Sequence, residues 1–300
     1  MTDYLVGTGG WAYFNVPNKP ALKAYSELFN FVEVNSTFYR LPSVQMVERW
    51  RRAVPKGFTF SVRCHQNLTH KTGLRPVDEA YELFYKMKNV AGVLQTPYLV
   101  LETPSGYTAN RDARDFLSSL NLKGLRLVWE YRAPVTQDVT NLMQDFGIIQ
   151  CVDLSRQKPS YSLDVTYSRL FGKGQQNIYQ FTDGELLEIQ RQAEDTNSSK
   201  VMLAFHGLRM NSDASRFQQH LLTGSFPSVT SAVGVDSAKS VLAEDASFPS
   251  SKSELIKKQG WKVIDVKPNK TAHLSDFLGG IPDKNYGSLD EVVKELEAVI

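Results

Sequence analysis

The sequence predicts a closed (β/α)8 barrel of the TIM type with a small C-terminal α/β extension. The chain has 300 residues, of which 42% are hydrophobic, which is enough for one large core. Apolar runs with strand character alternate with longer amphipathic stretches, a pattern typical of a parallel sheet covered by helices. Eight such runs fall within about 220 residues, close to the usual size of a barrel of this kind.

Each predicted strand is short and rich in β-branched and aromatic residues. The strands are expected at residues 4–7, 31–34, 58–62, 98–101, 125–129, 148–152, 178–181 and 201–205. The stretches between them repeat apolar residues at helical spacing. The helices are expected at residues 21–29, 44–53, 77–89, 111–119, 135–146, 183–193 and 213–222.

An open, doubly wound sheet is the alternative fold, but the first turn reads GTGGW and lacks the GxGxxG pattern of dinucleotide-binding sheets. The glycines of this turn indicate instead a backbone that passes close to another group. The barrel is expected to occupy residues 1–224. Residues 225–300 are expected to form a closing segment and a small α/β annex, with a capping box at Ser288 and Glu291 before the last helix.

Composition limits the classes of protein to which the chain can belong. A formal net charge of +2 argues against a protein that coats a polyanion. The amino terminus lacks the features of a signal peptide, and the chain lacks a long apolar stretch, so we expect a cytoplasmic protein without a membrane partner. Cys64 and Cys151 lie in or beside apolar runs and are expected to be reduced core thiols.

Polar residues stand at the ends of the predicted strands, where the loops of such a barrel carry the reactive groups. Glu33 lies inside the run FVEVN and Glu130 inside LVWEYR, although carboxylates are depleted in strands. Together with Asp153 and His70 they are the predicted catalytic residues. The structural alternative for these acids is a set of ion pairs, for example between Glu130 and an arginine.

Other polar and aromatic residues at the same strand ends are expected to bind the substrate. Arginines suit phosphate or carboxylate groups, amides and histidines provide hydrogen bonds, and aromatic rings provide stacking surfaces. The predicted substrate-binding residues are Trp11, Asn35, Tyr39, Arg63, Glu102, Arg132 and His206.

The pattern leaves several chemistries open. Carboxylates with histidines could hold a divalent metal ion that activates water, but no HxH, HExxH or HxD pair is present, so the metal ligands stay unknown. Carboxylates with arginines suit an anionic or sugar-like substrate, and two glutamates on nearby strands could form a glycosidase pair.

Four sequence blocks, GTGGWAY, FVEVNSTFYRLPS, VERWRRAVPKGFTFSVRCHQNLTH and LVWEYR, resemble the YecE-like family, a domain of unknown function. The resemblance is strong over about residues 4–155, weaker to about residue 222, and absent from the annex. It implies a TIM-like barrel and a polar pocket at the strand ends. The residues that it places there are Trp11, Glu33, Asn35, Tyr39, His70, Glu130 and Arg132.

The chain also departs from the family pattern. It has Arg63 where the family tends to have lysine and Glu102 where the family has glutamine. The late R-x-H-G pattern is placed at residues 180–184, and the F-N-N pattern reads Phe205–His206–Gly207. These changes suggest either a different substrate or a loss of activity.

The main functional hypothesis is a hydrolase, similar to a phosphoesterase or nuclease, that acts on a phosphorylated or nucleic-acid-derived substrate. The alternative is a non-catalytic pocket for a small anion or nucleotide, or for single-stranded nucleic acid, in which case the annex contacts an unknown protein partner.

Overall fold

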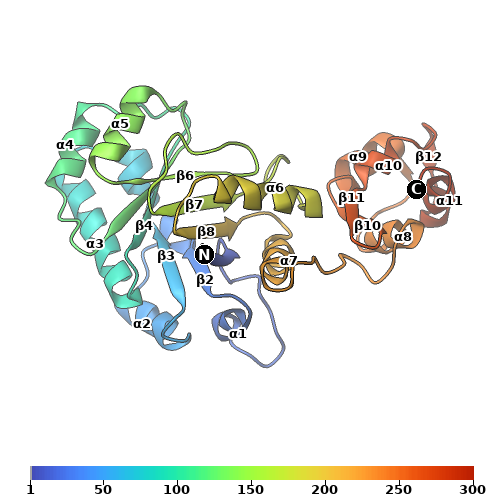
Figure 1. Ribbon diagram of the computed structural model, residues 1–300, viewed down its shortest axis with the longest axis horizontal. Coiled ribbons are helices and arrows are strands. Elements are labelled where there is room, and N and C mark those ends of the chain that lie inside the picture. Colours follow the sequence, from blue (N-terminus) through green and yellow to red (C-terminus); the bar gives the residue numbers. More distant parts are fainter. Residues whose placement is uncertain (1) are drawn as a thin grey trace. The chain divides into compact units, whose positions relative to one another are not determined.

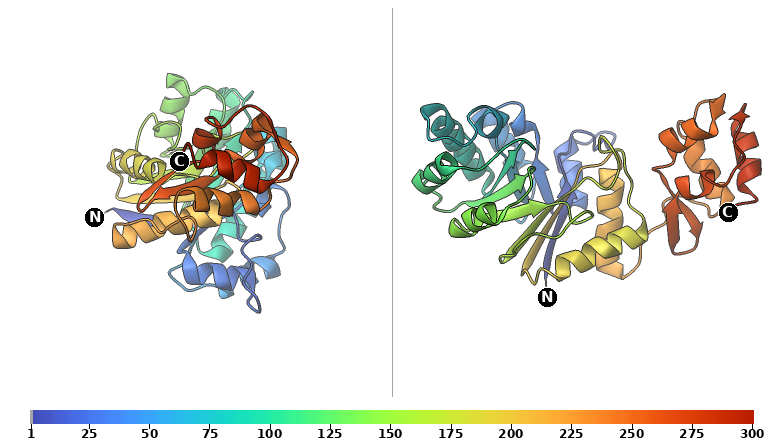
Figure 2. Two further views of the ribbon diagram at one scale, coloured as in Figure 1. Left: turned by 90° about the vertical axis from the view of Figure 1, so that its right-hand side faces the viewer. Right: turned by 90° about the horizontal axis from the view of Figure 1, so that it is seen from above.

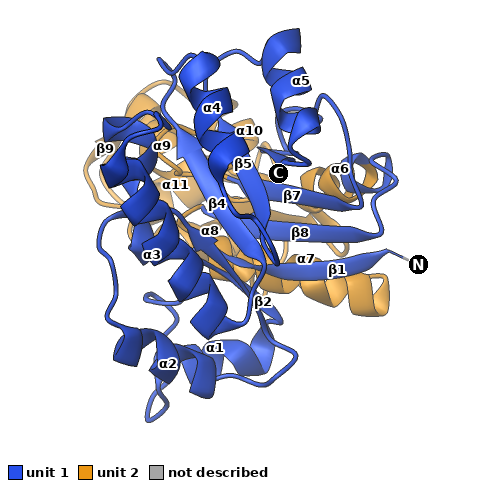
Figure 3. Cartoon of the chain, turned by 90° about the vertical axis from the view of Figure 1, so that its left-hand side faces the viewer, with its two compact units in different colours: residues 1–170, 192–206 blue, residues 171–191, 207–300 orange. Residues whose placement is uncertain are grey.

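The structure is a computed structural model that describes residues 2–300. Contacts between residues divide the chain into two compact units (Figure 3). The first unit contains residues 2–170 together with Gln192–His206, and the second contains Phe171–Arg191 together with Gly207–Ile300. The boundary expected at residue 224 stays a prediction.

The first unit contains the predicted barrel, in which eight parallel strands close in sequence order (Figure 1). The ring closes between the first and eighth strands, where Asp3 pairs with Lys200 and Thr8 with Phe205. The strands are β1 (Asp3–Thr8), β2 (Phe31–Val34), β3 (Thr59–Arg63), β4 (Tyr98–Thr103), β5 (Arg126–Tyr131), β6 (Ile149–Val152), β7 (Val165–Leu170) and β8 (Lys200–Phe205).

Five helices of the first unit follow the first five strands and lie on the outside of the barrel (Figures 1 and 2). Short helical turns, η1 (Ser36–Phe38) and η2 (Asn67–Lys71), precede two of them. Side chains of Ser43, Asn110 and Thr136 cap three of the helices at their amino ends. The helices are α1 (Ala21–Leu28), α2 (Val44–Arg52), α3 (Asp78–Leu94), α4 (Arg111–Ser119) and α5 (Gln137–Asp145).

One predicted strand is wrong. Residues 178–181 (Ile-Tyr-Gln-Phe) have no regular secondary structure, and the seventh strand is Val165–Leu170 instead. The strand VTYSRL contains four polar or amphipathic side chains, yet all six residues are buried. Its polar residues conceal it in the sequence, because their partners come from other strands. The described residues 153–164, between β6 and β7, form no helix.

Apolar side chains fill much of the interior of the barrel, as expected for this fold. Cys151 belongs to this core, and Cys64 is buried as well, so both thiols are free and buried as predicted. Burial raises the pKa of the Cys64 thiol to about 12. The core residues are Leu5, Phe31, Tyr98, Val100, Val128, Ile149, Cys151, Val165, Tyr167, Met202 and Ala204.

The second unit contains helices and two small antiparallel sheets, one pairing β10 with β11 and the other β12 with β9. Its own core includes Leu242, Ile264 and Leu296. The elements are most of α6 (Asp183–Glu194), α7 (Met210–Thr223), α8 (Val235–Ala243), β9 (Ser250–Ser251), α9 (Lys252–Gln259), β10 (Val263–Lys267), β11 (Lys270–His273), α10 (Ser275–Leu278), β12 (Asn285–Tyr286) and α11 (Leu289–Leu296).

The capping box expected before the last helix is only half formed. Ser288 accepts a hydrogen bond from the Glu291 N–H, but the Glu291 carboxylate accepts from Gly287 rather than from Ser288. A complete capping box is present instead at Ser251 and Glu254, at the start of α9. None of the helices within residues 2–300 combines the length and apolar character needed to cross a membrane.

Candidate functional site

Charged side chains gather inside the barrel at the carboxyl ends of the strands. Every second residue of a strand faces the interior, so the strand sequences above place charges over the apolar core. Buried charges are costly unless each one is paired, so their partners decide what the site can do. The charged residues that meet here are Glu33 on β2, Arg63 on β3, Glu102 on β4, Glu130 on β5 and Arg169 on β7, with His206 directly after β8.

Arg169 is the centre of this group. Its side chain is 2% exposed and contacts three carboxylates. Nε lies 3.1 Å from Glu33 Oε1, and Nη1 lies 2.7 Å from Glu102 Oε2 and also bonds Glu130 Oε2. One guanidinium therefore links acids from three different strands.

Two further arginines complete the network. Arg63 bonds Glu102 and donates to the side-chain oxygen of Asn35, and its guanidinium lies 3.4 Å from the centre of the Phe38 ring. Arg132 bonds the other oxygen of Glu102 at 3.0 Å. Its Nε also donates to Glu130 Oε1 at 2.9 Å. Three arginines thus balance three glutamates, and we refer to these six residues as the mouth network: Glu33, Arg63, Glu102, Glu130, Arg132 and Arg169.

Hydrogen bonds from neighbouring side chains hold Glu33 in place. The Tyr167 hydroxyl donates to Glu33 Oε2 at 2.8 Å and lies 2.7 Å from Ser61 Oγ. His206 Nε2 lies 3.3 Å from Arg169 Nε and 3.3 Å from Glu33 Oε1. A Cβ atom at Gly9 would come within 2.2 Å of the His206 ring, which confirms that this turn passes close to another group.

The network fixes the charge of its members. Burial opposes ionisation of Glu33, but the guanidinium of Arg169 holds the pKa of this carboxyl well below its usual value. For Glu130 burial again opposes ionisation, and Arg169 with Arg132 lowers the pKa. Burial and the neighbouring Arg169 lower the pKa of His206. At neutral pH the acids are therefore ionised and the imidazole is neutral, with Nε2 available to accept from Arg169.

Three predicted residues lie on the loops that follow β1, β2 and β3. Tyr39 is 64% exposed, and Trp11 packs edge-on against Trp50 with ring centres 5.3 Å apart. His70 is exposed, and its Nδ1 lies 2.9 Å from Thr69 Oγ1. Burial lowers the pKa of His70, Glu102 raises it, and Arg63 and Arg132 lower it. The pKa of His70 therefore depends on the charges of the mouth network.

Asp153 makes several bonds within its own part of the chain. One of its oxygens accepts from Ser155 N at 2.9 Å and from Ser155 Oγ at 2.6 Å, and the other lies 3.6 Å from Arg156 Nε. These partners belong to its own loop after β6, a turn arrangement common for aspartate. Its predicted catalytic role stays a prediction.

The sequence interpretation missed Arg169 and Tyr167 because it missed β7. The signal was present in two forms. The run VTYSRL alternates side chains with the period of a strand, and Arg169–Leu170–Phe171–Gly172 matches the first and last positions of the late R-x-H-G pattern. The placement of that pattern at residues 180–184 therefore needs correction, since Arg169 lies at a strand end and residues 180–182 do not.

A divalent metal does not fit the residues present. Within residues 2–300 no group of three or more His, Cys, Asp or Glu side chains is arranged to hold a metal ion. The glutamates that would be expected to ligate one are directed at the guanidinium of Arg169, which takes the place of a cation between them.

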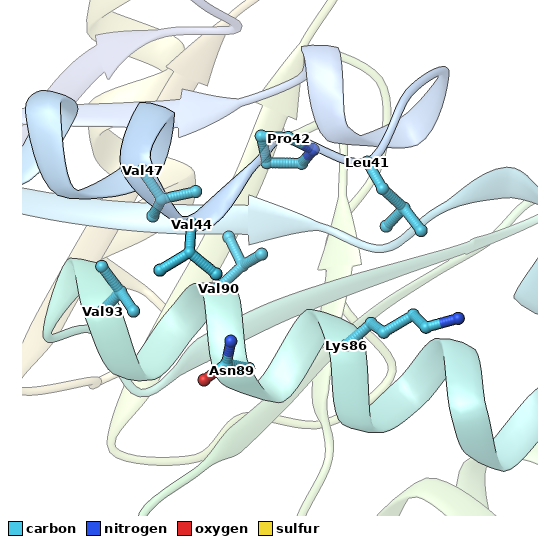
Figure 4. A pocket seen from close by; sticks show the side chains of 8 residues that line it. All are labelled: Leu41, Pro42, Val44, Val47, Lys86, Asn89, Val90 and Val93. Atoms are coloured by element: carbon cyan, nitrogen blue, oxygen red, sulfur yellow. The ribbon is translucent and has the colours of Figure 1, made fainter.

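An apolar pocket of about 160 Å³ lies away from the strand ends, between α2 and α3 on the outside of the barrel (Figure 4). Valines from both helices line it, and Lys86 is its only charged residue. Lys86 lies 3.5 Å from Glu82 of its own helix. The pocket therefore offers packing space without acid–base chemistry. Its lining residues are Leu41, Pro42, Val44, Val47, Lys86, Asn89, Val90 and Val93.

Comparison with known proteins gives a consistent family. The model of a protein family described as "Protein of unknown function DUF72" matches residues 5–229. The UPF0759 protein YunF of Bacillus subtilis (strain 168) is 35% identical over 101 residues, covering 31% of this chain and 34% of the relative. The UPF0759 protein YecE of Escherichia coli (strain K12) is 31% identical over 101 residues, covering 33% of this chain and 37% of the relative. The chain thus spans about a third of the length of these relatives.

Two solved structures share the fold. A DUF72 family protein from Thermotoga maritima MSB8 superposes with a TM-score of 0.58 at 17% identity, covering 73% of this chain and 99% of that chain. Another, from Enterococcus faecalis V583, gives a TM-score of 0.57 at 12% identity, covering 74% and 98%. At these identities the likeness establishes the fold alone.

Proposed function

Because this chain belongs to the DUF72 family, a TIM-barrel family whose description names no activity, we propose from its own site that it is a hydrolase of phosphorylated or nucleic-acid-derived substrates. The family match and the YecE and YunF relatives confirm the resemblance found in the sequence. The observation that carries the proposal is the mouth network, whose accessible members are Arg132 and Glu130.

Exposure within the network decides which groups can meet a substrate. The side chain of Arg132 is 41% exposed and that of Glu130 is 14% exposed, whereas Glu33 is 0% and Glu102 is 2% exposed. Arg132 is already oriented by its two carboxylate partners, so binding a phosphate costs little further ordering of its side chain. The fork of a guanidinium has five N–H donors, and those left over suit phosphate oxygens.

The proposed reaction uses His70 as the general base. Its neutral imidazole takes a proton from water as the water oxygen forms a bond to phosphorus. The ester P–O bond breaks, and the leaving oxygen takes up a proton, which yields an alcohol and a phosphate. Arg132 stabilises the charge on the phosphoryl oxygens. Glu130 orients Arg132, and the buried Glu33 acts as a positioning residue through Arg169 and His206.

The aromatic rings at the mouth fit the organic part of such a substrate. Tyr39 and Trp11 lie on the loops after β2 and β1 and offer stacking surfaces for a base or a sugar. Asn35 and Arg63 bond each other and supply polar groups. These residues keep their predicted role in substrate binding.

Hydrolysis of p-nitrophenyl phosphate and bis-p-nitrophenyl phosphate by the full chain tests the proposal. We expect Arg132→Gln and His70→Gln each to lower kcat/KM by about a hundredfold or more. Arg126→Gln is the matched control, because Arg126 lies at the opposite end of the same strand and bonds Asp164. Wild-type rates in both mouth variants, or no turnover by the wild-type protein, would contradict the proposal.

Non-catalytic anion binding is the second candidate, favoured by the complete pairing of the three glutamates. A network that is already neutralised resembles a preorganised receptor rather than a set of reactive acids. Stabilisation by phosphate or a nucleotide without turnover, measured by thermal unfolding, would favour binding. A steep loss of affinity with salt would identify single-stranded nucleic acid as the ligand. A protein partner of the annex stays a prediction.

A further inference from the structure

The second unit has a cavity of its own, with a volume of about 420 Å³. Its walls come from the loop before α6, from α9, and from the residues around β10, β11 and α10. The lining combines aromatic rings, amides and a lysine, the mixture expected of a pocket for a small polar ligand. The lining residues that define this second-unit pocket are Gln175, Gln176, Tyr179, Lys257, Trp261 and His273.

The aromatic rings are held in place by their own contacts. The indole N–H of Trp261 donates to the Lys258 carbonyl at 2.9 Å, so the ring needs no polar partner from a ligand. The rings of Tyr179 and His273 are 5.1 Å apart. Gly172 lies so close to Tyr179 that a Cβ there would come within 2.1 Å of its ring. The pocket thus has preset ring surfaces for a planar ligand.

The acid beside the pocket is already neutralised. Glu185 accepts from the Tyr179 hydroxyl, lies 3.2 Å from His273 Nε2, and lies 3.1 Å from Lys173 Nζ. Burial raises the pKa of Glu185, but bonds from His273 and Tyr179 bring it down to about 2. Burial lowers the pKa of His273, but the bond to Glu185 raises it above its ordinary value. Glu185 is therefore ionised, and Lys173 and His273 are its partners.

Lys257 is the charge that remains at the pocket. It is exposed in the last turn of α9, and none of the ion pairs in the described part of the chain includes it. The next residue, Lys258, lies 3.7 Å from Glu254 and is not part of the lining. The pocket therefore presents rings together with one unpaired cation. The rings favour a planar aromatic ligand, and the lysine favours a ligand that carries a negative charge.

We propose that the second-unit pocket binds a nucleoside monophosphate unit, with the base against Trp261 and Tyr179 and the phosphate at Lys257. Neither half of this ligand is sufficient alone: a lone phosphate makes no use of the rings, and a neutral sugar makes no use of the lysine. The unit can come from a free nucleotide or from a nucleotide within a single strand. The proposal does not depend on the hydrolase reaction at the barrel.

Calorimetric titration of the full chain tests the proposal. The titrated protein carries the substitution Arg132→Gln. This substitution removes the arginine proposed to bind phosphate at the barrel and leaves the second-unit pocket intact. The probes are adenosine monophosphate, adenosine, inorganic phosphate and a short single-stranded oligodeoxyadenylate. We expect adenosine monophosphate to bind about tenfold or more tightly than adenosine or phosphate, because a charge-assisted bond and a stacking contact each contribute that much.

Added substitutions separate the two halves of the ligand. Lys257→Gln should weaken adenosine monophosphate about tenfold and leave adenosine unchanged. Trp261→Leu should weaken both, and Trp261→Phe should restore part of the loss, which distinguishes stacking from a damaged fold. Lys258→Gln is the matched control and should bind like its parent.

The outcomes are distinct. Tighter binding of the oligonucleotide identifies the strand as the source, and equal or tighter binding of the mononucleotide identifies the free ligand. No binding of either one, or equal effects of Lys257→Gln and Lys258→Gln, would overturn the proposal. Failure of the hydrolase assay leaves these results unaffected, so the two proposals fail separately.

Discussion

The barrel mouth and the second-unit pocket use charge in opposite ways. At the mouth, three glutamates and three arginines compensate one another, and most of them are buried. Beside the second-unit pocket, Glu185 is paired with Lys173 and bonded to His273, and Lys257 stays outside the ion pairs of residues 2–300. The first arrangement orients side chains rigidly. The second leaves a charge for a ligand. The comparison teaches that the number of charges at a site says less than their pairing.

Two buried acids show the same contrast at the level of a single group. Glu33 meets Arg169, His206 and Tyr167, and its pKa is held below the usual value despite burial. Asp213 in the second unit is buried, lies 3.5 Å from Arg216, and accepts one backbone N–H. Burial outweighs Arg216 there and raises the pKa of Asp213 to about 7. The number and closeness of the cations around each carboxylate decide which effect prevails.

The largest effect is expected from Arg169→Met. Removing this guanidinium leaves three carboxylates without their shared cation, which should lower the free energy of unfolding by about 3–5 kcal/mol or prevent folding. Urea denaturation of the variant and the wild-type protein measures the loss. A loss below about 1 kcal/mol would show that the network contributes little to stability.

A smaller effect is expected from Glu33→Gln, about 2–3 kcal/mol at neutral pH, because the amide leaves Arg169 less well paired. The pH dependence is the sharper test. The folded pKa of Glu33 lies below its unfolded value of about 4.3, so its stabilisation is present above that pH and is lost as the pH falls. The difference in unfolding free energy between the wild-type protein and Glu33→Gln should therefore become smaller from pH 7 to pH 3. A gap that stays constant would assign the effect of the substitution to packing.

Asp213→Asn tests the second unit between acidic and neutral pH. The folded pKa of Asp213, about 7, is above its unfolded value, so its stabilisation is complete at low pH and is lost as the pH rises through 7. Between the unfolded value of about 3.9 and pH 7, the free energy of unfolding of the wild-type protein should fall by up to about 1.4 kcal/mol per pH unit, and that of the variant should fall less. Unfolding free energies between pH 5 and pH 9 measure both slopes. Equal pH dependence of the unfolding free energy in the two proteins would mean that Asp213 is ionised across this whole pH range.

The smallest effect is expected from Arg126→Gln. Arg126 and Asp164 form a bidentate pair at the amino end of β5 and the segment before β7, with side chains 30% and 61% exposed. Such exposed pairs contribute about 0–1 kcal/mol, and salt weakens them further. Unfolding in low and high salt should show little difference between variant and wild type. A loss as large as that of Arg169→Met would remove the distinction between buried and exposed pairs.

Much of the fold could be predicted from the sequence, because local patterns determine it. The seven strands that were recognised are apolar runs, and the glutamates could be noticed because Glu33 and Glu130 interrupt such runs and Glu102 ends one. In a barrel of this type the carboxyl ends of all strands lie on one face, so these acids could be assigned to a common face before any distance was known.

The centre of the network could not be predicted in the same way. Tyr167 and Arg169 make their strand look polar, and their partner Glu33 lies more than a hundred residues earlier in the sequence. A buried arginine is explained only by acids from other strands, and such pairings appear only after the barrel closes. For the same reason the sequence could not show that Glu33 is fully enclosed while Arg132 stays accessible.

The sharing of one guanidinium by three strands also constrains evolution. A neutral residue at position 169 would leave the carboxylates at positions 33, 102 and 130 without their shared cation. Single substitutions of Arg169 should therefore be selected against. Among homologous barrels we therefore expect the arginine at position 169 to be lost only where acids disappear as well. Arg126 and Asp164, by contrast, should drift independently of the mouth.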